Sequence, residues 1–175
     1  MKNFDSISSV LDRSICAGGD VYDGFKQRLG QGLLTQEENP LSHFCVYFLP
    51  YNPENKKVFI VHHKKSGLWI SPGGHMDKGE TVWETANREI NEELGVKSFF
   101  KETPPPFLLT ITPIDSQAYA CKLHFDIWCL VQTDGKDFDI DGQEFFDTKW
   151  LTIGEARQVV TNSQNIMALD LVEKM

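Results

Sequence analysis

Three glutamates are spaced to lie on one side of a single helix. Glu89, Glu92 and Glu93 stand at positions i, i+3 and i+4, which are neighbours on a helix surface, where like charges cost about 0.2–0.5 kcal/mol per pair. Solvated acidic faces usually alternate Glu with Lys, but Arg88 is the one cation of segment 82–94. Oxygen-only donors suit Mg²⁺ or Mn²⁺ rather than zinc. The spacing therefore favours a divalent-metal site over a solvated acidic face.

The sequence marks both ends of this helix. Thr81 followed by Glu84 is a capping-box pattern, so the helix is predicted to begin at about Val82. Gly95 supplies a C-terminal stop after Leu94. At about 100° per residue, the apolar side chains fall on one face beside the glutamates: Trp83, Ala86, Ile90 and Leu94.

A longer motif surrounds the glutamates and resembles a known one. It reads Gly74, five residues, Glu80, seven residues, Arg88-Glu89-Ile90, one residue, Glu92-Glu93, one residue, Gly95-Val96. This resembles the complete Nudix box, GX5EX7REUXEEXGU with U an aliphatic residue, at every specified position. The segment is therefore identified as part of a Nudix (MutT-like) hydrolase domain.

The resemblance implies a reaction and roles for the residues of the box. The reaction is hydrolysis of the diphosphate bond of a nucleoside diphosphate derivative or a (d)NTP, by attack of water activated by Mg²⁺ or Mn²⁺. The implied metal ligands are Glu89, Glu92, Glu93 and the backbone carbonyl of Gly73, with Glu93 also catalytic. Arg88 is implied to orient a carboxylate of the box through a salt bridge.

A further acidic residue is expected in the site. Some Nudix enzymes carry one before the strand that leads to a C-terminal Trp, and Glu144 stands six residues before Trp150. The resemblance makes Glu144 a candidate ligand or general base. Acidic loops are common, and Asp139 and Asp147 lie nearby, so a solvated loop stays open as the alternative.

Segment 61–75 enters the glycines of the box directly and is expected to line one wall of the site. Its candidate substrate-binding residues are His63, Lys65 and Trp69, to which His124 is added from a later strand. A phosphate could accept hydrogen bonds from the basic side chains, and Trp69 could stack on a base. The open alternatives are a solvated turn for Lys65 and structural packing for the histidines and Trp69.

The remaining pattern predicts the elements that position these residues. Strands are expected at 42–50, 57–64, 69–71, 106–114, 118–131 and 145–151, the first two as a hairpin, and helices at 82–94, 154–160 and 165–173. Helical spacing on either side of Ala17-Gly18-Gly19 predicts two short N-terminal helices.

The fold class is α/β: a Nudix-type α/β/α sandwich with a curved mixed sheet. We expect a helical extension at 1–40 and the Nudix domain at 41–175.

The composition and net charge of the chain argue against some kinds of binding partner. The chain has 175 residues, 41% of them hydrophobic, and a formal charge of −8, which disfavours sequence-independent binding to nucleic acid through a basic face. No segment resembles a signal peptide or a membrane helix, so no membrane partner and a cytoplasmic protein are expected. The four cysteines lack zinc-ligand spacing and are expected as reduced, packed thiols. A homodimer is left open.

Two other functions compete with the hydrolase. A Nudix-fold nucleotide sensor or interaction module would bind without turnover, although a pure binder has no need of mutually repulsive glutamates. A hydrolase of nucleic-acid caps or 5′ ends would need an electropositive channel, which the overall charge does not indicate. The identity of the nucleotide stays open.

Overall fold

The structure is a computed structural model of the chain, and it describes residues 2–97, 99–102, 105–115, 120–140 and 142–175. The strands are β1 (Ser42–Asn52), β2 (Lys57–His63), β3 (Trp69–Ile70), β4 (Gly73–His75), β5 (Pro106–Pro113), β6 (Leu123–Gln132) and β7 (Phe145–Thr152). The α-helices are α1 (Lys2–Val10), α2 (Gly19–Gly30), α3 (Val82–Leu94), α4 (Ile153–Val159) and α5 (Ser163–Val172), and a 3-10 helix, η1, covers Arg13–Ile15.

The long strand β1 is the centre of a mixed sheet. On one side it pairs in parallel with β6, from Ser42 opposite Leu123 to Tyr51 opposite Gln132, and β6 pairs antiparallel with β5. On the other side β4 pairs with the first half of β1 and β2 with its end. The expected hairpin is limited to two register pairs at Tyr51 and Asn52, after which β2 diverges to pair with β3 and β7.

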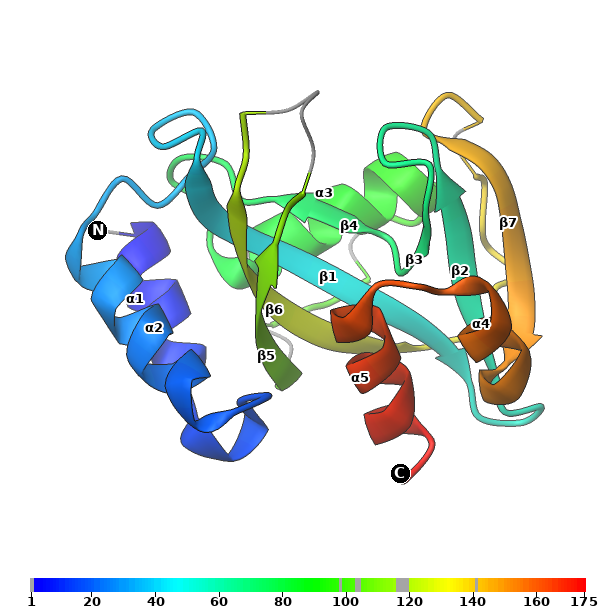
Figure 1. The fold of residues 1–175 in the computed structure, drawn as a ribbon. Coiled ribbons are helices and arrows are strands. Elements are labelled where there is room, and N and C mark those ends of the chain that lie inside the picture. The colour runs from blue at the N-terminus through cyan, green and yellow to red at the C-terminus, as the bar shows by residue number, and fades with distance from the viewer. Residues whose placement is uncertain (1, 98, 103–104, 116–119, 141) are drawn as a thin grey trace.

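Helices cover both faces of this sheet, as Figure 1 shows with α3 behind it and α5 in front. Alternation along β1 explains the two layers, since successive side chains of a strand point to opposite faces. Val46 and Phe48 pack in the same cluster as α3 residues such as Ile90, whereas Leu49 packs with α4 and α5 residues such as Leu169. The expected α/β/α sandwich with a mixed sheet is confirmed.

The N-terminal helices share the core of the sheet. Ile7 of α1 and Phe25 of α2 are fully buried in one cluster with Phe44 of β1. The buried Arg28 of α2 donates hydrogen bonds to the carbonyl oxygens of Gly32 at 2.7 Å and of Ser42 at 2.7 Å, which fixes the entry into β1. The N-terminal helical extension of the fold is confirmed, while its separation from residues 41–175 as a domain stays a prediction.

Most of the expected elements are present, with small shifts at their ends. The strand expected at 118–131 is β6, which begins at Leu123, and residues 116–119 lie outside the described part of the chain. The short strand β4 was not expected, because Gly73-Gly74 reads as a loop. None of the helices in the described residues is both long and apolar enough to span a bilayer.

Candidate active site

The N-terminal cap of helix α3 and its buried face set where the helix begins and how it is rotated about its own axis. The Thr81 hydroxyl accepts a hydrogen bond from the Glu84 N–H, and the Glu84 carboxylate accepts one from the Thr81 N–H at 2.8 Å, which forms the expected capping box. Ala86, Ile90 and Leu94 are fully buried against the sheet. Because this apolar face sets the rotation of the helix, the neighbouring glutamates face β4.

Two glycines let β4 approach the helix closely. A Cβ atom at Gly74 would lie 2.4 Å from Glu89 Oε1, and one at Gly73 would lie 2.4 Å from the Val46 carbonyl oxygen. Gly73 also has a φ of 136°, which L side chains rarely adopt. The Gly73 N–H donates a 2.7 Å hydrogen bond to Glu93 Oε2. The missing side chain at Gly74 therefore lets β4 lie against the Glu89 carboxylate, and the missing side chain at Gly73 lets β4 lie against the backbone of β1.

Arg88 links the helix to the loop before it. Its Nε donates to Glu80 Oε1 at 2.9 Å, and its Nη1 donates to Glu89 Oε1 at 2.7 Å and Glu92 Oε2 at 3.1 Å. Its Nη2 donates to the His75 carbonyl oxygen at 2.8 Å. These ion pairs outweigh burial and raise the pKa of Arg88. The guanidinium thus holds Glu89 in place and ties it to β4.

The carboxylate cluster, defined as Glu89, Glu92 and Glu93, is costly to keep ionised. Glu89 and Glu93 are only 8% and 5% exposed. Burial raises the pKa of Glu89 to about 7, although Arg88 opposes the shift. Burial and the neighbouring Glu89 raise the pKa of Glu93 well above its usual value, and the ion pairs of Arg88 do not reach Glu93. Buried carboxylate oxygens without enough positive charge fit a hard divalent cation such as Mg²⁺ or Mn²⁺.

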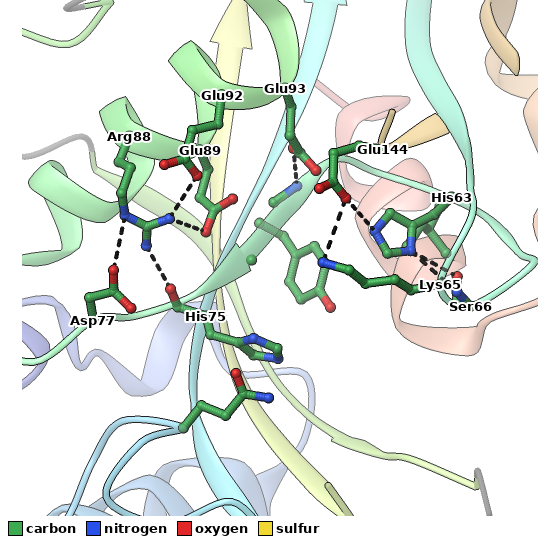
Figure 2. A pocket seen from close by; sticks show the side chains of 15 residues that line it. His63, Lys65, Ser66, His75, Asp77, Arg88, Glu89, Glu92, Glu93 and Glu144 are labelled. Atoms are coloured by element: carbon green, nitrogen blue, oxygen red, sulfur yellow. Dashed lines mark hydrogen bonds and ion pairs between the residues drawn. The ribbon is translucent and has the colours of Figure 1, made fainter. Parts of the chain in front are cut away.

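The other wall of the cavity carries Glu144 between two basic side chains. Glu144 Oε2 lies 3.6 Å from Lys65 Nζ and 3.9 Å from His63 Nε2. The Glu144 carbonyl oxygen accepts a 3.0 Å hydrogen bond from the Lys64 N–H, which fixes this residue beside the end of β2. Burial and Lys65 lower the pKa of His63, although Glu144 opposes the shift. Figure 2 shows this group across the cavity from Arg88.

These two walls enclose a cavity of about 450 Å³. Most of the expected site residues line it: His63, Lys65, Gly73, Arg88, Glu89, Glu92, Glu93 and Glu144. Two expected residues do not. Trp69 stacks on His62 with ring centroids 5.0 Å apart, and His124 lies at the far end of β1 beside His43.

Sequence reasoning did not single out several residues of the lining: Gln36, Ser66, Ile70, His75 and Asp77. His75 and Asp77 follow the box glycines directly, so their position next to Gly74 was the available signal. Gln36 belongs to the segment before β1, and no pattern in the sequence indicates that this segment reaches the cavity.

Comparison with known proteins now places the chain. A model of the NUDIX domain matches residues 41–169, and the chain therefore belongs to the Nudix family. Nudix hydrolase 6 of Arabidopsis thaliana is 32% identical over 111 residues, which cover 59% of this chain and 37% of that protein. RNA pyrophosphohydrolase of Rhodopseudomonas palustris is 32% identical over 87 residues, covering 47% of this chain and 52% of that protein.

Solved structures agree on the fold. The dihydroneopterin triphosphate pyrophosphohydrolase of E. coli superposes with a TM-score of 0.59 at 19% identity, over 75% of this chain and 96% of that chain. The NUDIX domain of Shewanella oneidensis NrtR, complexed with ADP ribose, gives a TM-score of 0.53 at 18% identity, over 77% of this chain and 86% of that domain. The resemblance of the box to the Nudix family is confirmed by these matches together.

Proposed function

We propose that the protein is a metal-dependent pyrophosphohydrolase that cleaves the diphosphate bond of a nucleotide derivative. The observation that carries the proposal is the carboxylate cluster, in which Glu89 and Glu93 are buried and Glu92 is exposed, and which lines a cavity with basic groups on its other wall. Several of the relatives are named hydrolases, and one is named an RNA pyrophosphohydrolase. The cavity volume of about 450 Å³ lies within the usual range for small-molecule sites.

The proposed cation is Mg²⁺ or Mn²⁺, held by the three glutamates and the Gly73 carbonyl oxygen. When bound, such a cation neutralises phosphate charge and lowers the pKa of water. The chain's own residues do the rest. Arg88 fixes Glu89, while the Gly73 N–H fixes Glu93. Both carboxylates are thus oriented before the substrate arrives.

On the opposite wall, we assign phosphate binding to Lys65 and His63. A Lys ammonium is a point charge suited to phosphate oxygens, and Lys65 is an exposed side chain at the cavity rim. Glu144 is assigned as the general base that accepts a proton from the attacking water. His63 and Lys65 flank the Glu144 carboxylate and place it at the cavity wall. Service as a further metal ligand is the alternative role for Glu144.

The test is a substrate panel in Mg²⁺ or Mn²⁺, containing nucleoside triphosphates, ADP-ribose, dinucleoside polyphosphates and 5′-triphosphorylated RNA. Phosphate, pyrophosphate and nucleoside monophosphate are measured separately, because the product set shows which bond is cleaved. We expect turnover of a small nucleotide that stops in chelator. Tight binding without turnover of any member would instead support the nucleotide sensor. Turnover of RNA alone, weakening steeply with salt, would support the 5′-end hydrolase.

A further inference from the structure

A second cluster of metal-binding side chains lies on the other side of β4 from the glutamates. It consists of His43, Cys45, His75 and His124, called the His–Cys cluster below. Strand register brings these residues together: His43 pairs with His124 across β1 and β6, and Cys45 pairs with His75 across β1 and β4. Residues two apart on a strand point to the same face, so His43 and Cys45 share one face of β1. Figure 2 shows the His75 ring pointing away from the glutamates.

The four donor atoms are already close to one another. One ring nitrogen from each histidine and the Cys45 Sγ all lie within 4.8 Å of each other. The three imidazole rings have centroids 4.6, 4.9 and 5.1 Å apart. Zinc bonds of about 2.0–2.3 Å in a tetrahedral site put ligand atoms roughly 3.3–3.8 Å apart. Small side-chain rotations would therefore bring these four atoms to bonding distance of one ion.

Hydrogen bonding leaves the ring nitrogens of His124 available to an ion. His124 is 8% exposed, and neither of its ring nitrogens has a hydrogen-bond partner in the described residues. Buried polar groups are otherwise nearly always satisfied. The fully buried His43 directs Nδ1 to the Asn39 carbonyl oxygen at 3.1 Å, and its Nε2 has a weak sulfur hydrogen bond to Cys121 Sγ at 3.7 Å, which a bound ion would replace. Metal-ligating histidines commonly have such a carbonyl partner on their other nitrogen.

Asp126 supplies the charge that such an ion would need nearby. It pairs with Cys45 in the β1–β6 register and is fully buried. Its Oδ2 accepts hydrogen bonds from Thr110, at 3.0 Å, and from Thr112, while its Oδ1 has no partner in the described residues. A divalent cation bound by one thiolate carries a net charge of +1, and the Asp126 carboxylate would balance it. Hydrogen bonds alone do not explain a carboxylate at this position.

We propose that His43, Cys45, His75 and His124 bind one structural Zn²⁺ ion. Nitrogen and sulfur donors suit zinc, whereas the oxygen donors of the carboxylate cluster suit Mg²⁺ or Mn²⁺. Four protein ligands complete a tetrahedral site, which is the arrangement of structural rather than catalytic zinc. The ion would join β1, β4 and β6 at one point. It would also fix β4, whose Gly73 N–H and His75 carbonyl oxygen hold Glu93 and Arg88.

The test is the zinc content of the purified full chain after passage over a chelating resin in excess Mg²⁺, measured by plasma mass spectrometry. We expect about one zinc per chain for the parent, and less than about a tenth of that for Cys45→Ser and for His124→Asn. Cys16→Ser changes a cysteine outside the cluster and should keep its zinc. Glu92→Gln changes the carboxylate cluster and should also keep it, which separates this site from the proposed catalytic one.

A second measurement does not depend on the variants folding. The parent is stripped of metal and reloaded with Co²⁺, and its absorption spectrum is recorded. Intense visible bands of tetrahedral cobalt, with a thiolate charge-transfer band in the near ultraviolet, are expected. A parent chain without zinc that also lacks both cobalt bands would overturn the proposal. Full zinc content in folded Cys45→Ser and His124→Asn would do the same.

Discussion

Two ionisable clusters meet at β4, and they differ in almost every chemical respect. The carboxylate cluster presents oxygen donors, its members repel each other, and it borders an open cavity. The His–Cys cluster presents nitrogen and sulfur donors and sits between strands of the sheet, with His43, Cys45 and His124 buried. Burial raises the pKa of Glu89 to about 7 but lowers that of His124 to about 3. The same desolvation thus favours protonated acids in one cluster and neutral bases in the other.

Closeness of donor atoms alone therefore does not define the kind of metal site. Gly73 and His75 are two residues apart on β4, yet the first contacts Glu93 and the second joins the His–Cys cluster. An oxygen-donor site that borders a cavity can exchange its ion and admit a substrate. The His–Cys cluster has four nitrogen and sulfur donors, of which three are on buried residues and one, His75, also lines the cavity. Such a donor set is suited to hold one ion permanently. The predictions below test whether the two clusters have these separate roles.

The largest expected effect is on turnover. Glu93→Gln keeps an oxygen that can accept from the Gly73 N–H but removes the charge, so kcat should fall by about three orders of magnitude with a much smaller change in substrate affinity. Steady-state kinetics on the substrate found in the panel would measure this. Glu54→Gln, at an exposed residue in the turn between β1 and β2, is the matched control and should leave kcat unchanged. Activity of Glu93→Gln within a few-fold of the parent would remove the metal assignment.

The second prediction concerns stability against pH in chelator. Glu89 has a pKa of about 7 when folded and 4.5 as a model group, so between these values the folded chain binds more protons than the unfolded one. The Glu89 contribution to stability is therefore lost as pH rises through this window. The free energy of unfolding of Glu89→Gln, relative to that of the parent, should therefore rise by on the order of 3 kcal/mol as pH increases from about 4.5 to about 7.5. Urea unfolding at several pH values would measure it, and a pH-independent difference would contradict the assignment.

In the same unfolding experiment, the His–Cys cluster should give the opposite dependence of stability on pH. His75 and His124 have folded pKa values of about 4 and about 3, below the model value of 6.5, because of burial. Between these values the unfolded chain binds more protons, so stability is lost as pH falls below about 6.5. His124→Asn should reduce this loss of stability at acid pH, and it should leave unchanged the part of the pH dependence that comes from Glu89. If His124→Asn changed both parts of the pH dependence together, the two clusters would titrate as one unit.

The fourth prediction uses bound metal to reverse the order in which the parent and Glu93→Gln melt. In chelator, Glu93→Gln should be as stable as the parent or slightly more so, because it removes a buried repulsive charge. Mg²⁺ at 100 times its Kd should stabilise the parent by about 2.7 kcal/mol, a rise of roughly 5–10 °C in Tm, which the variant would largely lose. Equal destabilisation of Glu93→Gln in both buffers would instead indicate a structural ion pair.

The smallest expected effect separates the roles of Glu144. Glu144→Gln should lower kcat by about 10- to 100-fold at saturating metal if this residue is the general base. Partial rescue by high metal would identify it as a ligand instead. Asp147→Asn, a partly exposed acid in β7 that pairs with Lys149, is the matched control. Unchanged kinetics in Glu144→Gln would support the alternative that Glu144 belongs to a solvated loop and has no role in the reaction.

The carboxylate cluster could be predicted from sequence because helix geometry is local. The capping pair Thr81 and Glu84 fixes where α3 begins, and the 3.6-residue period then fixes which side chains share a face. Glu89, Glu92 and Glu93 therefore had to lie together once the helix formed. The same local reasoning succeeded for the order of strands and helices, and the bounds of α3 agree with the expectation at both ends.

Glu144 and Lys65 show where local reasoning ends. They were expected in the site from the resemblance, but their 3.6 Å approach depends on the antiparallel pairing of β2 with β7. Trp69 and His124 were expected in the same cavity, and each faces other neighbours instead. A strand pattern tells which side chains alternate, but it does not tell which strand lies next to it.

The Nudix box and the face of α3 that carries the three glutamates follow from the sequence alone, because both depend on short-range spacing. The convergence of His43, Cys45, His75 and His124 follows from the tertiary structure instead. These residues come from three strands far apart in the chain, and no ligand spacing links them in the sequence. Their meeting depends on the parallel β1–β6 register and the β1–β4 pairing. Such pairings are set by burial of the whole sheet between its helices, a property that no short segment encodes.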